Sequence, residues 1–432
     1  MPPSNKKAKS TIEWVVFKPE QVEEARKIMK DLRGDSTLDA MGFGALFEPI
    51  SDRLFPGTST LHTWLRYQIF VPSIIYSLND QKKLSTEAAS ELKNLEYKLQ
   101  RLLVTTSHKQ KEKTGEDTMG IIGRSREEQI KYWPSMIYWS SLNILGVWGE
   151  KPVSREQVLS LIEKNKEGAI INDDEDQEVS LDEDLYICED LYQIANEFIF
   201  KDISAGKLPE QLDFKLTRKE GQYFKKRYKE NFADSLVSYL IDLNVSSVEK
   251  IDSLFMVGGI ENKKLFSLIE NAKKYSFLAQ GGTYLYNSIL CGDKNRDEAK
   301  ILNIQYLQKW LNNIEELISW DIDELYEALR KYGGFHEDKK LQDLKKFTRF
   351  IKNKFIAERD AEKLISREEV IKRVREREFE VKGNRSRFEN SSIRIPMRIF
   401  QDNGYQDYLY DYRWDVGKQN ALDVIRGLNR QC

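Results

Sequence analysis

Apolar residues recur along this chain at the three- and four-residue spacing of amphipathic helices, and strand-like alternation is rare. Leucines at helical spacing fill residues 86–103, and an aromatic-rich apolar run occupies residues 134–147. The same spacing continues through residues 347–356. The pattern therefore predicts a mostly α protein of many helices, packed into two or three helical subdomains with few short strands.

Local signals predict where some helices begin and where they break. Thr217 and Glu220 have the spacing of a capping box, so a helix is expected to begin near Arg218. The pair Gly281 and Gly282 predicts an interruption of a long helical pattern. A polar, glycine-containing loop is expected over residues 107–125, and a short strand or extended arm over residues 11–17, before a first helix.

Charge is distributed unevenly and indicates a domain division. Residues 173–190 carry ten acidic residues and no basic one, which is typical of an exposed linker. Residues 339–398 carry nineteen Lys/Arg against ten Asp/Glu, a local excess of about nine positive charges. The expected organisation is a helical N-terminal domain (1–170), an acidic linker (171–192), a middle helical domain (193–335) and a basic, helical C-terminal region (336–432).

Composition narrows the class of protein further. The chain has 432 residues, is 40% hydrophobic and has a formal net charge of −2, so any electrostatic signal must be local. Three cysteines and three histidines lie far apart in sequence, which argues against a disulfide framework or a metal site, and no cofactor is expected. The longest apolar run, residues 69–78, is too short to span a membrane. These features predict a cytoplasmic protein without a membrane segment.

The stretch LFPGTSTLHTWLRY, residues 54–67, places three hydroxyl residues after a Pro-Gly turn. Thr58, Ser59 and Thr60 are natural N-caps, and the apolar residues that follow have helical spacing. A helix start with added hydroxyls and Arg66 nearby could bind phosphate. Two alternatives are an ordinary cap between packed helices and a helix-hairpin-helix element, in which Ser59 would replace the second glycine.

Two further regions contain candidate nucleic-acid contacts. In residues 120–149, closely spaced glycines and arginines accompany a cluster of tryptophans and tyrosines, which would suit an extruded base or simply form a core. Near the C-terminus, arginines form an electrostatic footprint for a polyanion, although interleaved glutamates also fit a solvated charged helix. The expected phosphate ligands are Thr58, Ser59, Thr60, Arg66, Arg124, Arg385, Arg387 and Arg413, and the expected pocket residues are Tyr67, Tyr138, Trp139, Tyr286 and Asn287.

Three acidic residues close to the Pro-Gly turn are the catalytic candidates: Asp39, Glu48 and Asp52. A buried carboxylate next to a cation could act as a general base toward water or stabilise an oxocarbenium-like sugar cation. The established motifs of nucleotide hydrolases, serine hydrolases, zinc proteases and zinc deaminases do not occur in the sequence.

Three blocks of the sequence resemble DUF6361, a family of bacterial proteins: residues 41–72, residues 120–148, and residues 385–390 with 410–414. Because these blocks extend from the N-terminal third to the C-terminus, the similarity covers the full length. The first block departs from the family's Arg-x-Arg-Tyr pattern, since Trp64 stands at the first arginine. This departure puts a two-arginine clamp in doubt.

The resemblance implies a role in bacterial antiphage defence. On this basis the protein would be a DNA glycosylase that excises a modified, glucosylated hydroxymethyl cytosine from phage DNA and leaves abasic sites. Double-stranded DNA would then be the partner, without a metal. The alternatives are a non-enzymatic DNA-binding subunit of a defence complex and, third, a metal-dependent nuclease.

Overall fold

The computed structural model describes residues 39–80, 87–115, 117–124, 130–149, 151–171, 190–191, 193–194, 212–390, 392–393, 395 and 399–430. These residues belong to one compact unit, Thr37–Cys432. They form sixteen α-helices and three 3-10 helices, and this part of the chain contains no strand. The mostly α prediction is confirmed. The predicted arm at residues 11–17 and the acidic residues 173–189 lie outside the described residues, and the predicted domain division stays a prediction.

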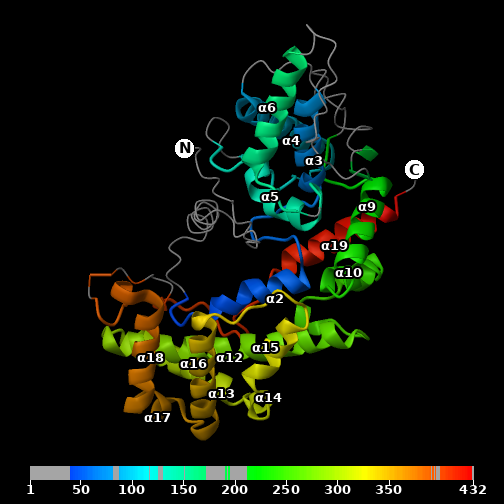
Figure 1. Cartoon of the computed structure of the whole chain (residues 1–432). Coiled ribbons are helices and arrows are strands. Elements are labelled where there is room, and N and C mark those ends of the chain that lie inside the picture. The colour runs from blue at the N-terminus through cyan, green and yellow to red at the C-terminus, as the bar shows by residue number, and fades with distance from the viewer. Residues whose placement is uncertain are drawn as a thin grey trace, which may run out of the picture. The chain divides into compact units, whose positions relative to one another are not determined.

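The chain described begins with η1 (Phe43–Leu46) and α2 (Phe47–Leu54). A first group of four helices follows, in which α3 (Tyr67–Asp80) packs against the other three (Figure 1). The other three are α4 (Ala88–Thr114), α5 (Pro134–Ile144) and α6 (Arg155–Ile171). The helices expected at residues 86–103 and 134–147 are confirmed. The loop expected at residues 107–125 is partly wrong, because α4 continues to Thr114 and ends only at Gly115, whose φ of 76° suits glycine.

A second group is built on the longest helix, α12, against which α13, α15 and α16 pack. Its elements are α12 (Lys263–Asp293), α13 (Asp297–Leu311), α14 (Glu315–Ile318), α15 (Ile322–Arg330), α16 (Lys339–Ala357), α17 (Ala361–Ser366), α18 (Glu368–Lys382) and η3 (Gly383–Arg385). The predicted break at Gly281 and Gly282 is wrong, since α12 is continuous. The two glycines instead admit close neighbours: an added Cβ would lie 2.6 Å from Trp310 or 2.5 Å from Phe43.

A third group packs around the last helix. Its elements are α9 (Arg218–Asn231), α10 (Leu236–Ile241), α11 (Val245–Glu249), η2 (Leu254–Met256) and α19 (Trp414–Leu428), and α19 contacts α9, α10 and α11. The capping box is confirmed, because Thr217 accepts from the Glu220 N–H while the Glu220 carboxylate accepts from the Thr217 N–H.

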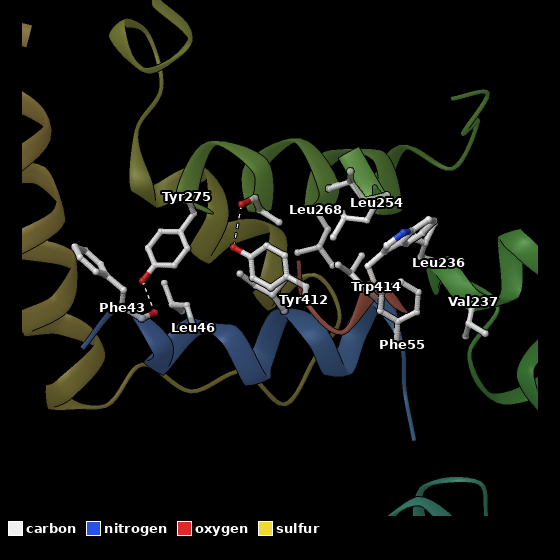
Figure 2. Close-up of a cluster of buried hydrophobic side chains, with 14 of the residues drawn as sticks. Phe43, Leu46, Phe55, Leu236, Val237, Leu254, Leu268, Tyr275, Tyr412 and Trp414 are labelled. Carbon is white, nitrogen blue, oxygen red and sulfur yellow. Dashed lines mark hydrogen bonds between the residues drawn. The ribbon is translucent and has the colours of Figure 1, made fainter. Parts of the chain in front are cut away.

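Helix α2 connects the second and third groups, since it contacts both α12 and α10. Figure 2 shows the buried side chains at this junction, with Phe43 and Leu46 at one end and Phe55 beside Trp414 at the other. Two tyrosine hydroxyls fix the backbones: Tyr275 donates to the carbonyl of Phe43 at 2.7 Å, and Tyr412 donates to the carbonyl of Ala272 at 3.0 Å. The segment before α19 is therefore held against α2 and α12.

Candidate functional site

Residues 55–66, named the connector here, join α2 to α3 without forming a helix. The prediction that Thr58, Ser59 and Thr60 cap a helix is wrong, because α3 begins at Tyr67. The Thr58 hydroxyl donates to the carbonyl of Phe55 at 2.6 Å, and the Ser59 hydroxyl accepts from the Leu61 N–H at 3.3 Å. The hydroxyls of Thr58 and Ser59 therefore stabilise turns, while Thr60 is exposed.

Tertiary contacts replace the helical hydrogen bonds that the connector lacks. The Tyr138 hydroxyl accepts from the N–H groups of Thr63 and Trp64, at 2.9 and 3.1 Å, and donates to the carbonyl of Trp64 at 2.9 Å. Ser141 donates to the carbonyl of Gly57 at 2.6 Å. Helix α5 thus determines the path of the connector, which explains why helical spacing alone gave the wrong start for α3.

Four of the predicted site residues meet where the connector leaves α2. Arg413 forms ion pairs with Glu48 and with Asp52, the latter at 2.8 Å between Nη1 and Oδ1. The same Nη1 donates to the carbonyl of Thr58 at 2.7 Å. Glu48 and Asp52 are four residues apart on α2 and therefore share one face of the helix. They are named the carboxylate pair.

Arg413 is fixed from several directions. Arg413 is 7% exposed, and its guanidinium carbon lies 6.0 Å from the centroid of the Phe47 ring. Its φ of 64° is the left-handed conformation that a non-glycine residue seldom adopts, and the preceding Tyr412 has a φ of 51°. The surrounding contacts must stabilise this backbone, so it aims a buried cation at the carboxylate pair.

The carboxylate pair faces solvent, in contrast to its arginine. The side chain of Glu48 is 41% exposed and that of Asp52 is 46% exposed. Burial raises the pKa of Asp52 to about 6, while the adjacent Arg53 lowers it. A carboxylate with this pKa is ionised at neutral pH and strong enough as a base to accept a proton.

Asp39, the third catalytic candidate, has a different position. One of its carboxylate oxygens accepts from the N–H of Phe43 at 2.8 Å, and the other accepts from the N–H of Gly44 at 2.7 Å. Burial raises the pKa of Asp39, and these backbone hydrogen bonds and Arg377 lower it. Both oxygens thus stabilise the first turn of η1.

The predicted pocket residues occupy two places. Tyr67 and Tyr138 lie together in the core, with ring centroids 5.3 Å apart, and Trp139 stacks on Trp148 at 5.1 Å. Tyr286, by contrast, is on α12 with Asn287. Its hydroxyl donates to Glu378 at 2.6 Å and accepts from Arg387 at 3.2 Å.

Several arginines predicted to bind phosphate have protein partners. Arg66 is 2% exposed and donates to Glu220 at 3.1 Å and to the carbonyl of Asp213 at 2.8 Å. Arg387 is 1% exposed, in the cluster with Tyr286. Arg124 pairs with Asp117 at 2.7 Å and retains 25% exposure of its side chain. Arg385 is exposed.

The sequence did not predict that Glu96 is a buried carboxylate that caps the start of α5. This residue is 1% exposed and accepts from the Ser135 N–H at 2.6 Å, at the start of α5. The N-cap residue of α5, Trp133, supplies no side-chain acceptor, and Pro134 follows it. A helix that starts with Trp-Pro signals a need for an external acceptor, but the sequence does not indicate which residue supplies it.

Within the described residues, His, Cys, Asp and Glu do not form a group of three that could hold a metal ion. None of the helices that the structure describes combines the length and apolar character needed to cross a membrane.

No curated protein and no solved structure matches the chain. A family model matches residues 9–169, which include the first two sequence blocks and end before the third. These residues also contain the carboxylate pair, the connector and α3–α5. The match is to DUF6361, a family of unknown function, so residues 9–169 of this chain are similar to that family.

Proposed function

We propose that this protein is a DNA glycosylase of bacterial antiphage defence that excises a glucosylated hydroxymethyl cytosine from double-stranded phage DNA and leaves an abasic site. One observation carries the proposal: two solvent-facing carboxylates, Glu48 and Asp52, converge on the buried Arg413. Cleavage of an N-glycosidic bond develops positive charge on the sugar, and a positioned carboxylate stabilises that charge or activates water.

The three side chains would have separate roles in this reaction. Asp52, with a pKa of about 6, would act as the base toward water or face the oxocarbenium-like sugar. Arg413 would orient the carboxylate of Asp52, and its positive charge offsets the repulsion between the two adjacent acids. Glu48 would be a positioning residue that shares the arginine.

Binding of DNA would require cations at the surface. The last turns of α4 present the exposed Lys109, Lys111 and Lys113, with Glu112 between them, and Arg385 is exposed after α18. Cations at such positions can neutralise phosphates and release counterions, so binding should weaken as salt increases.

The decisive experiment uses Asp52→Asn with Glu249→Gln as a matched control. Glu249 is 48% exposed and pairs with Arg426 at 2.7 Å, so the exposure and arginine contact of its carboxylate resemble those of Asp52, although Arg426 is exposed and Arg413 is buried. Wild-type protein in EDTA should produce alkali-labile abasic sites in glucosylated hydroxymethylcytosine DNA. Asp52→Asn should lower the rate by about 10²–10⁴-fold and leave DNA binding intact, whereas Glu249→Gln should match wild type.

The pH profile and the wild-type products complete the test. Because the base must be ionised, activity should rise with pH and reach half its maximum near pH 6. Modified DNA that stays intact with wild-type protein would rule out the glycosylase. Binding without product would favour the DNA-binding subunit, and metal-dependent strand breaks would favour the nuclease.

A further inference from the structure

Residues 117–124 form a loop whose base is closed by side chains; it is named the anchored loop. Asp117 accepts from the Ser107 hydroxyl at 3.0 Å and from Arg124 at 2.7 Å. Arg124 also donates to the carbonyl of Thr118 at 2.6 Å. The two ends of the loop are thereby tied to each other and to α4.

The tip of the anchored loop is held by the connector. The indole N–H of Trp64 donates to the carbonyl of Met119 at 2.8 Å, and the Thr63 hydroxyl donates to the carbonyl of Gly120 at 2.8 Å. Gly120 has a φ of 77°, and an added Cβ would lie 3.0 Å from Thr63. The backbone at the tip is therefore fixed, and glycine permits the close approach.

Met119 extends from this fixed backbone into solvent. Its exposure of 72% is the largest among the large hydrophobic residues that the structure describes. The adjoining end of α4 carries the exposed Lys109, Lys111 and Lys113, and Lys111 reaches Asp117 of the loop at 3.5 Å. An apolar tip on a fixed backbone, with the lysine-bearing end of α4 beside its loop, suits a polyanion with an apolar interior. Stacked bases between phosphate backbones have this character.

We propose that Met119 is a wedge that enters the base stack of duplex DNA and helps to extrude the target base; this proposal rests on the proposed function. The connector links the two sites directly, because Thr58 is held by Arg413 at one end while Thr63 and Trp64 hold the anchored loop at the other. A base removed from the stack beside Met119 would then lie next to the segment whose other end adjoins Arg413 and Asp52.

The test compares Met119→Ala and Met119→Leu with Met256→Ala, whose parent methionine is 68% exposed on η2. Duplexes carry 2-aminopurine next to the modified cytosine, and its fluorescence rises on unstacking. Wild type, Met119→Leu and Met256→Ala should raise the fluorescence. Met119→Ala should not, and it should slow excision from paired duplex by about ten- to a hundredfold, since unstacking costs a few kcal/mol.

A single-stranded substrate distinguishes loss of the wedge from a general loss of enzyme function in Met119→Ala, because the target base of a single strand needs no extrusion. Met119→Ala should excise from single strands at the wild-type rate. If Met119→Ala and Met256→Ala gave the same fluorescence and the same rate of excision from duplex DNA, the wedge proposal would be wrong. The proposed glycosylase activity would not be affected by that result. If the wild-type protein unstacked the DNA, Met119→Ala did not, and none of the proteins excised the base, the result would support the wedge and refute the glycosylase. Absence of both signals in wild type would overturn both proposals.

Discussion

Three buried glutamates, Glu96, Glu220 and Glu378, accept hydrogen bonds from backbone N–H groups at helix starts or turns. Each satisfies donors that no helical carbonyl can reach. Asp52 differs, because the Arg413 side chain donates to its carboxylate and nearly half of its own side chain is exposed. Partner and exposure together distinguish a capping carboxylate from one that can meet a substrate.

Glu96 should make the stability of the protein depend on pH. Burial raises its pKa from 4.5 to about 7, although the hydrogen bonds from Ser135 lower it. The folded state therefore binds this proton more tightly than the unfolded state. This contribution is fully present below pH 4.5 and is lost as the pH rises to about 7, by at most about 1.4 kcal/mol per pH unit.

Substitution Glu96→Gln should remove this dependence. The amide carries no titrating proton, and it can still accept from the Ser135 N–H and donate to the Ser135 hydroxyl. Urea unfolding of both proteins between pH 5 and pH 8 would measure the difference. The free energy of unfolding should decline with pH more steeply for wild type, and parallel curves would contradict the assignment.

At the residue scale, the sequence identified the members of the candidate site but not their arrangement. Glu48, Asp52 and Thr58 were selected because they lie close to one Pro-Gly turn. Arg413 was selected as a phosphate ligand, yet it binds the carboxylates 361 and more positions away in sequence. Pairing across such a separation depends on packing, which residue types do not encode locally.

The helices show where local patterns suffice and where packing overrides them. Spacing and caps predicted α4, α5 and α9 because those signals lie within the helices themselves. The interruption predicted at Gly281 and Gly282 was wrong because these glycines make room for the rings of Trp310 and Phe43. A glycine pair within a helix can thus indicate close packing as well as a break.

Substitution of either glycine by alanine should distinguish close packing from a helix break. An added Cβ at Gly281 or Gly282 would lie 2.6 or 2.5 Å from a buried ring, so Gly281→Ala and Gly282→Ala should each destabilise by about 1–3 kcal/mol. At Gly292, near the end of the same helix, the nearest atoms to an added Cβ belong to the flexible Lys300 at 3.4 Å, so Gly292→Ala should stabilise by up to about 1 kcal/mol. Denaturant midpoints measure all three variants, and destabilisation of equal size at the three sites would contradict this account.

At the scale of the whole molecule, buried arginines join segments that are distant in sequence. Arg66 connects the start of α3 to Glu220 on α9, 154 positions away. Arg413 similarly connects the start of α19 to α2. The sequence predicted phosphate-binding arginines at both positions, because arginines close to hydroxyl residues or aromatic rings are typical of nucleic-acid contacts. Their actual partners are acids supplied by other helices.

Substitution of Arg66 distinguishes these two roles. Arg66→Met leaves Glu220, which is 1% exposed, without its cation, so the free energy of unfolding should fall by about 3–5 kcal/mol. Arg426→Met removes a pair whose two side chains are each 48% exposed, and it should cost no more than about 1 kcal/mol. If Arg66 were instead a ligand of DNA phosphate, Arg66→Met would keep the stability of the wild type and reduce the salt dependence of DNA binding. Urea unfolding and a salt titration of DNA binding, measured on both variants, therefore decide whether Arg66 stabilises the fold or contacts DNA.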